Sequence, residues 1–165
     1  MGDYNWKLET IKAKNIALEM IRGAGSNQYR HLRKCANELL RSNPGSTCII
    51  KTADGDQPNG PVFERINVCL AAQKQAFVRI CRHLIGLDGC FLKGMYGGQL
   101  LTAVGKDGNN QMFPIAYAVV EAETTDSWRW FVNLLVRDLD SVEKKKWAFI
   151  SDKQKVSGIQ TYIYL

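Results

Sequence analysis

The sequence lacks the long apolar stretches that membrane-spanning proteins need. No run of ~18 apolar residues occurs in the chain, so a transmembrane helix is not expected. The first residues, Met1–Trp6, carry no apolar core of the secretory signal type. Cysteine is also sparse: there are five, an odd number, and no CxxC pair. This pattern favours reduced thiols in a cytosolic or nuclear protein over a disulfide framework.

Acidic residues are fewer than basic ones. The chain has 22 Lys and Arg against 16 Asp and Glu, a net charge of +6 and a pI near 9.1. Such a balance favours an anionic partner, of which nucleic acid is the commonest, although many soluble proteins are equally basic. With 165 residues the chain has room for one medium domain, or for a small domain and part of another.

Residues 1–43 predict a helical hairpin. Apolar residues recur at helical spacing over 6–23, Gly23 ends this helix, and Ser26 can cap a second one. The apolar stripe of the second helix is Tyr29, Leu32, Cys35, Ala36, Leu39 and Leu40. Two interpretations stay open: a small DNA-contacting module and a solvated packing hairpin.

A turn-rich segment, 44–61, follows and is the expected linker. One short strand is predicted within it, at 48–51. Residues 62–81 then predict another helix. Its expected apolar face is Phe63, Ile66, Cys69, Leu70, Ala72, Phe77 and Ile80.

The chain from residue 84 onward predicts a sheet. Apolar strands are expected at 84–92, 99–104 and 112–120, with an Asp-Gly hairpin turn at 106–110 joining the last two. A helix capped by Thr125 or Asp126 comes next, and its buried stripe is Trp128, Phe131, Leu135 and Leu139.

Trp147–Ser151 is the expected fourth strand. The predicted topology is three antiparallel strands, a crossover helix, and a fourth strand parallel to the first. A right-handed crossover can place that fourth strand directly beside the first.

Two aspartates interrupt or end these apolar strands. Asp88 lies midway along the first, and Asp152 follows the fourth. Carboxylates on neighbouring parallel strands can share divalent cations, and Mg²⁺ takes oxygen ligands while keeping several waters. Two such ions, roughly 3.5–4 Å apart, activate a water or hydroxyl and stabilise the leaving oxygen. The alternative is that Asp88 is a turn or strand-end acid bonded to backbone amides.

Other residues with chemical potential are expected to have plainer roles. His31 and Cys35 stand four apart on a helix, but without further ligands they predict a surface pair. Buried small apolar positions are expected for Cys69, Cys81 and Cys90, and core positions for Trp128 and Trp130. Lys93, Lys106 and Lys144–Lys146 are candidate phosphate contacts, with a solvated face as the alternative.

Residues 62–155 resemble the transposase domain of plant Mutator-like elements (MULE), a ribonuclease-H-like DDE family. The matching segments are Phe77, Cys81-Arg82, Ile85–Gly94, Gln99–Gly105, Asn109-Asn110, Pro114–Glu121, Asp126–Trp128 and Phe149–Lys155. The resemblance implies an α+β fold, a ribonuclease-H-like core preceded by a helical segment.

The resemblance also implies a function. It makes Asp88 the first catalytic acid and metal ligand and Asp152 the second, with Mg²⁺ or Mn²⁺ as cofactor. The implied partner is DNA, at transposon ends, and the implied location is the nucleus. The implied reaction is DNA strand cleavage and transfer.

The sequence departs from the family after Lys155. The family's third acid, a glutamate, comes well downstream on a helix, whereas thirteen residues follow Asp152 here and none is acidic. Residues 156–165 are expected to be a divergent tail, the core incomplete, and metal binding weak. Nothing in the resemblance lets Glu121 or Glu123 substitute. Three hypotheses for the function remain: an active transposase, a non-catalytic DNA-binding derivative, and a truncated fragment that folds poorly.

Overall fold

The computed structural model describes residues 12–14, 16–17, 29–53, 61–93 and 97–151. The chain divides into two compact units, Met1–Cys35 and Ala36–Leu165. None of the described helices is long and apolar enough to cross a bilayer. The hairpin expected in the first 43 residues is described only in part. Residues 12–14 and 16–17 are helical, and α3 spans Leu32–Ser42, while the predicted cap Ser26 lies outside the described residues.

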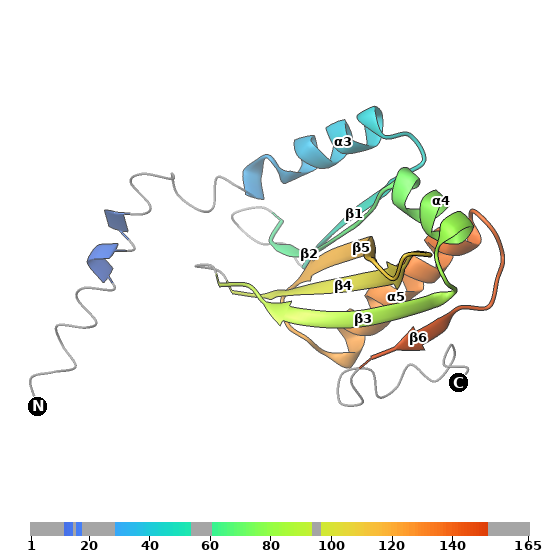
Figure 1. Cartoon of the computed structure of the whole chain (residues 1–165). Coiled ribbons are helices and arrows are strands. Elements are labelled where there is room, and N and C mark those ends of the chain that lie inside the picture. Colours follow the sequence, from blue (N-terminus) through green and yellow to red (C-terminus); the bar gives the residue numbers. More distant parts are fainter. Residues whose placement is uncertain (1–11, 15, 18–28, 54–60, 94–96, 152–165) are drawn as a thin grey trace, which may run out of the picture. The chain divides into compact units, whose positions relative to one another are not determined.

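The larger unit is an α+β structure built on a mixed six-stranded sheet. Its elements are β1 (Thr47–Thr52), β2 (Phe63–Cys69), α4 (Ala71–Ile80), β3 (Leu84–Phe91), β4 (Gln99–Lys106), β5 (Met112–Val120), α5 (Thr125–Asp140) and β6 (Ala148–Ile150). The strand order is β1-β2-β5-β4-β3-β6 (Figure 1). Every neighbouring pair is antiparallel except β3 and β6, which are parallel.

The predicted topology of the second half of the chain is confirmed. Strands β3, β4 and β5 form the antiparallel meander, α5 is the crossover, and β6 lies beside β3. The cap of α5 differs by one or two residues from the prediction. Thr124, not Thr125 or Asp126, is the N-cap: its hydroxyl accepts a hydrogen bond from the Ser127 amide at 3.1 Å.

The helix predicted over residues 62–81 is wrong in its first half, which is strand β2. Its buried residues include Arg65, Asn67 and Cys69, and this alternation has the period of a strand. Arg65 and Asn67 are polar, so the distribution of apolar residues in the sequence did not show the two-residue period of a strand. Only the second half of the segment is helical, as α4.

Part of the segment expected to be a linker belongs to the sheet. Strand β1 pairs antiparallel with β2 from Thr47↔Cys69 to Thr52↔Phe63. Residues 54–60 lie outside the described residues. Ser46, just before β1, accepts a hydrogen bond from the amide of Ala71 at 2.8 Å and so satisfies a donor in the first turn of α4.

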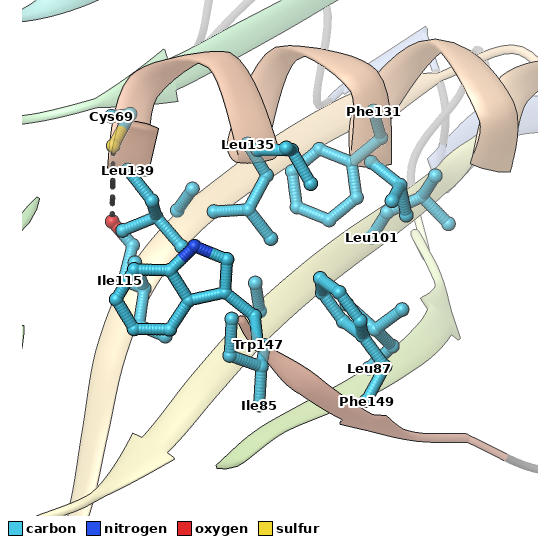
Figure 2. Close-up of a cluster of buried hydrophobic side chains, with 14 of the residues drawn as sticks. Cys69, Ile85, Leu87, Leu101, Ile115, Phe131, Leu135, Leu139, Trp147 and Phe149 are labelled. Atoms are coloured by element: carbon cyan, nitrogen blue, oxygen red, sulfur yellow. Dashed lines mark hydrogen bonds between the residues drawn. The ribbon is translucent and has the colours of Figure 1, made fainter. Parts of the chain in front are cut away.

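The apolar core lies between the sheet and its helices. Trp128, Phe131, Leu135 and Leu139 of α5 are all almost fully buried, as predicted. Figure 2 shows side chains from α5 and those from β3 and β6, such as Ile85 and Phe149, pointing toward one another. Trp147, just before β6, also packs into this core and contacts Phe77 of α4 with its ring tilted by 39° and the ring centroids 5.4 Å apart.

The two faces of the sheet differ sharply in burial. In β4, Gln99, Leu101, Ala103 and Gly105 face the core and are buried, whereas Leu100, Thr102 and Val104 are half-buried and Lys106 is exposed. In β3, Ile85 and Leu87 are buried, while Asp88 is exposed. We call the face that carries Asp88, Thr102 and Lys106 the outer face of the sheet. The exposed carboxylate of β3, that of Asp88, therefore lies on the outer face of the sheet.

A buried ion pair ties the helices to the edge strand. Lys74 of α4 and Asp138 of α5 are both more than 90 % buried, and their Nζ and Oδ1 atoms lie 3.1 Å apart. The hydroxyl of Thr47 at the start of β1 donates to the same Oδ1 atom at 2.5 Å. Charges this deeply buried need such partners, so the pair fixes where β1 meets α4 and α5.

The close approach of α4 to β4 predicts an asymmetric response to two glycine substitutions. A Cβ atom at Gly105 would lie 2.6 Å from Cε2 of Phe77, a ring with no exposed surface, whereas one at Gly108 would meet nothing within 4 Å. Gly105→Ala should therefore lower the free energy of unfolding by about 1–3 kcal/mol, the usual cost of overpacking a core. Urea unfolding of both variants measures this. Equal midpoints for Gly105→Ala and the Gly108→Ala control would contradict it.

Candidate functional site

Asp88 is held at the outer face by the register of β3 and β4. It pairs with Thr102, whose hydroxyl donates to the Asp88 backbone carbonyl at 3.1 Å. The Gly89 amide donates to the Asp88 carboxylate Oδ1 at 2.8 Å. The backbone amide contact expected of a strand-end acid is therefore present. It is compatible with a ligand role, because a carboxylate has more acceptor sites than one amide uses.

The second predicted acid, Asp152, lies outside the described residues. The strand leading to it is described: β6 pairs in parallel with β3 through Leu84↔Ala148, Ile85↔Phe149 and Gly86↔Ile150. Asp88 comes two residues after Gly86 in the sequence, and Asp152 comes two residues after Ile150. The two acids thus have equal offsets from the last described pair of a parallel ladder.

Glu121 is committed to a structural ion-pair network. Arg65 of β2 donates to both Glu121 carboxylate oxygens, at 2.8 and 2.6 Å, and to Asp126 at 2.8 Å. Its guanidinium also lies 5.8 Å from the ring centroid of Trp130, within cation–π range. This pairing holds the segment after β5 and the first turn of α5 to β2.

The Arg65 network shifts the acidity of its carboxylates. The hydrogen bond from Arg65 holds the pKa of Asp126 below its usual range. For Glu121, burial pushes the pKa up, but the hydrogen bond and charge of Arg65 outweigh it and lower the pKa overall. Both groups are therefore anionic at neutral pH.

The carboxylate of Glu123 lies close to Gly89 of β3, on the covered face of the sheet and so on the side opposite Asp88. Trp128 Nε1 donates to its Oε1 at 3.1 Å. A Cβ atom at Gly89, the neighbour of Asp88, would lie 3.0 Å from that same oxygen. Sequence reasoning missed this proximity because 34 positions separate Gly89 from Glu123 and no local pattern links them.

Within the residues that the structure describes, no three His, Cys, Asp or Glu side chains gather as a metal site needs. His31 and Cys35 are both exposed, as expected of a surface pair. Cys69 and Cys81 are buried as predicted, and burial raises the pKa of the Cys69 thiol to about 12. Cys90 is exposed, so its predicted burial is wrong: it lies near the end of β3 on the outer face.

The basic candidates differ in their surroundings. Lys93, Lys106 and Lys144 are exposed, and Lys145 pairs with Glu143 at 2.9 Å. Arg82 belongs to a segment quoted for the family resemblance, but it was not among the predicted phosphate contacts. It comes opposite Lys106 because Cys81 and Asp107 form an isolated antiparallel bridge, just before β3 begins at Leu84.

Comparison with protein families gives one match. Residues 84–161 match the family described as the MULE transposase domain. These are 78 of the chain's 165 residues, just under half, and they run from the first residue of β3 past Asp152. No curated protein and no solved structure matches the chain. The MULE match begins later than the predicted domain start at residue 62, and it extends beyond Lys155, where the resemblance was expected to end.

The Arg65 network makes a pH-dependent contribution to stability. The side chains of Glu121 and Asp126, two of the three acids paired with Arg65, are 43 % and 68 % exposed, so water screens them. Arg65→Gln should therefore cost about 2 kcal/mol at pH 7, less than a fully buried pair. Because the folded pKa values are lowered, this contribution is fully present above the unfolded values near 4 and is lost as pH falls through the folded ones.

Urea unfolding of the parent chain and Arg65→Gln between pH 3 and pH 7 tests this sign. The difference in unfolding free energy should shrink toward the acid end. A difference that is constant with pH would contradict the assignment.

Proposed function

We propose that this chain is derived from a Mutator-like transposase and that Asp88 and Asp152 are carboxylate ligands for Mg²⁺ or Mn²⁺ on a ribonuclease-H-like core. The observation that carries the proposal is the parallel β3–β6 ladder within the MULE match. Continued by two residues on each strand, this ladder would bring the two aspartates opposite each other. The strand order β5-β4-β3-β6 with α5 as crossover supports the ribonuclease-H-like core.

The residues present fit a hard divalent cation. Asp88 is an exposed oxygen donor at the outer face, its backbone fixed by Thr102 and its carboxylate oriented by the Gly89 amide. Outer hydrogen bonds of this kind orient a ligand before the ion binds. When bound, the ion would supply charge stabilisation to a phosphodiester and lower the pKa of a coordinated water or hydroxyl. Two carboxylates alone give a site of low charge, and we therefore expect weak metal binding.

DNA is the proposed substrate or partner, and the nucleus the proposed location. The MULE match suggests DNA interaction, and the net charge of +6 favours a polyanion. A second function uses the same surface without chemistry: a non-catalytic DNA-binding protein derived from a transposase. The weak metal site expected above favours this second function over strand transfer.

The metal assignment predicts that either aspartate is needed for Mn²⁺ binding. Removing one of two charged ligands in Asp88→Asn or Asp152→Asn should weaken Mn²⁺ binding by about tenfold or more, measured by electron paramagnetic resonance. Asp140→Asn, in the last turn of α5, is the control with the same change of charge. Unchanged Mn²⁺ affinity in Asp88→Asn and Asp152→Asn would overturn the site.

DNA binding separates the two candidate functions. We expect salt-dependent binding of a labelled DNA duplex to survive Asp88→Asn, because a carboxylate attracts no phosphate. Nicking of supercoiled DNA with Mn²⁺, if it is lost in both Asp88→Asn and Asp152→Asn, would establish catalysis and exclude the non-catalytic function. Nicking retained in both variants would overturn the assignment of these two acids.

A further inference from the structure

Two cations face each other at the end of the outer sheet face. The amide of Arg82 donates to the carbonyl of Lys106 at 2.9 Å, next to the antiparallel bridge between Cys81 and Asp107. Residues directly opposite in such a pairing project to the same side. Lys106 belongs to the outer face, because it continues the alternation of Leu100, Thr102 and Val104 along β4. Arg82 therefore shares that face with it.

The charges of this pair are not neutralised. Both side chains are exposed, and neither forms an ion pair with any residue that the structure describes. Elsewhere in the larger unit, Lys51, Arg65, Lys74 and Lys145 are each within 3.1 Å of a carboxylate.

The nearest acid in the sequence, Asp107, alternates with Lys106 along the chain and bridges the buried Cys81, so its side chain projects to the other side of the strand. Its Oδ1 accepts from the amides of Asn109 and Gln111, both at 2.8 Å. Arg82 and Lys106 are thus left as two adjacent positive charges, and Arg79, exposed in the last turn of α4, precedes them in the chain.

The spacing to Asp88 fits a nucleic-acid backbone. Lys106 lies four residues from Thr102 on the same face of β4, and Thr102 is the partner of Asp88. Four residues of strand span ~13 Å at ~3.3 Å per residue. Phosphates of one DNA strand are separated by the rotation about the helix axis as well as by the ~3.4 Å rise per nucleotide, so a straight-line distance of ~13 Å corresponds to about two nucleotide steps of a duplex. A phosphate held at Arg82 and Lys106 thus leaves another phosphodiester of the same strand within reach of Asp88.

We propose that Arg82 and Lys106 form a phosphate clamp that holds the DNA backbone about two nucleotides from Asp88. The clamp carries no sequence information and acts by fixing the register of the DNA, as phosphate contacts do. This inference rests on the proposed DNA-directed function and adds the surface that positions the substrate.

A matched pair of double variants tests the clamp on the full chain. Arg82→Gln with Lys106→Gln removes two charges from the outer face. Arg129→Gln with Arg137→Gln removes two charges from exposed positions on α5, which covers the opposite face. The probe is a labelled DNA duplex of random sequence, titrated at several salt concentrations. Unfolding midpoints of all variants verify that each remains folded.

We expect the clamp variant alone to change the salt dependence. Its slope of log affinity against log salt should be shallower by about 1.8, and its affinity about tenfold lower or more near ~0.1 M salt. Arg82→Lys with Lys106→Arg should keep the parental slope, because the charges remain. Equal slopes for the two glutamine variants, or no change in either, would overturn the clamp. If the parent chain binds no DNA, both the clamp and the proposed function are overturned. If the parent chain binds DNA and Arg82→Gln with Lys106→Gln leaves the affinity and its salt dependence unchanged, the clamp alone is overturned.

Discussion

Burial of α5 against the sheet is the interaction on which the rest of the structure depends. The helix hides Trp128, Phe131, Leu135 and Leu139 in the core, and it can do so only if the chain crosses the sheet between β5 and β6. That crossing makes β6 parallel to β3. The proposed metal site depends on this crossing, because the parallel pairing gives β3 and β6 the same direction through Gly86 and Ile150.

Charged residues on the covered face and on the outer face of the sheet have different roles. On the covered face, charged side chains such as Lys74 with Asp138 and Arg65 with Glu121 form ion pairs that anchor elements. On the outer face, Asp88, Arg82 and Lys106 stay exposed. Charge on this face costs little desolvation, so it is available to a ligand. Stability and proposed function therefore draw on opposite faces of β3 and β4.

The packing of charges also separates acids of similar sequence context. Glu121 and Glu123 stand two residues apart, yet the first is clamped by Arg65 and the second accepts a hydrogen bond from Trp128 beside Gly89. Glu121 directly follows β5, which pairs with β2, the strand that carries Arg65. Glu123 comes two residues later, and its carboxylate lies next to Gly89 of β3. Position relative to the strands, rather than residue type, decides what each carboxylate can do.

The sequence by itself determined the meander, the crossover helix and the strand that follows it. Strong alternation, an Asp-Gly turn and a regular helical stripe are local signals that need no knowledge of distant contacts. Tertiary structure decided the rest. Strand β2 buries Arg65 and Asn67, which interrupt its apolar pattern in the sequence. Only the tertiary structure therefore showed that β2 is a strand paired with β1 and β5. The approach of Glu123 to Gly89 and of Arg82 to Lys106 likewise depends on long-range pairing, which sequence spacing does not encode.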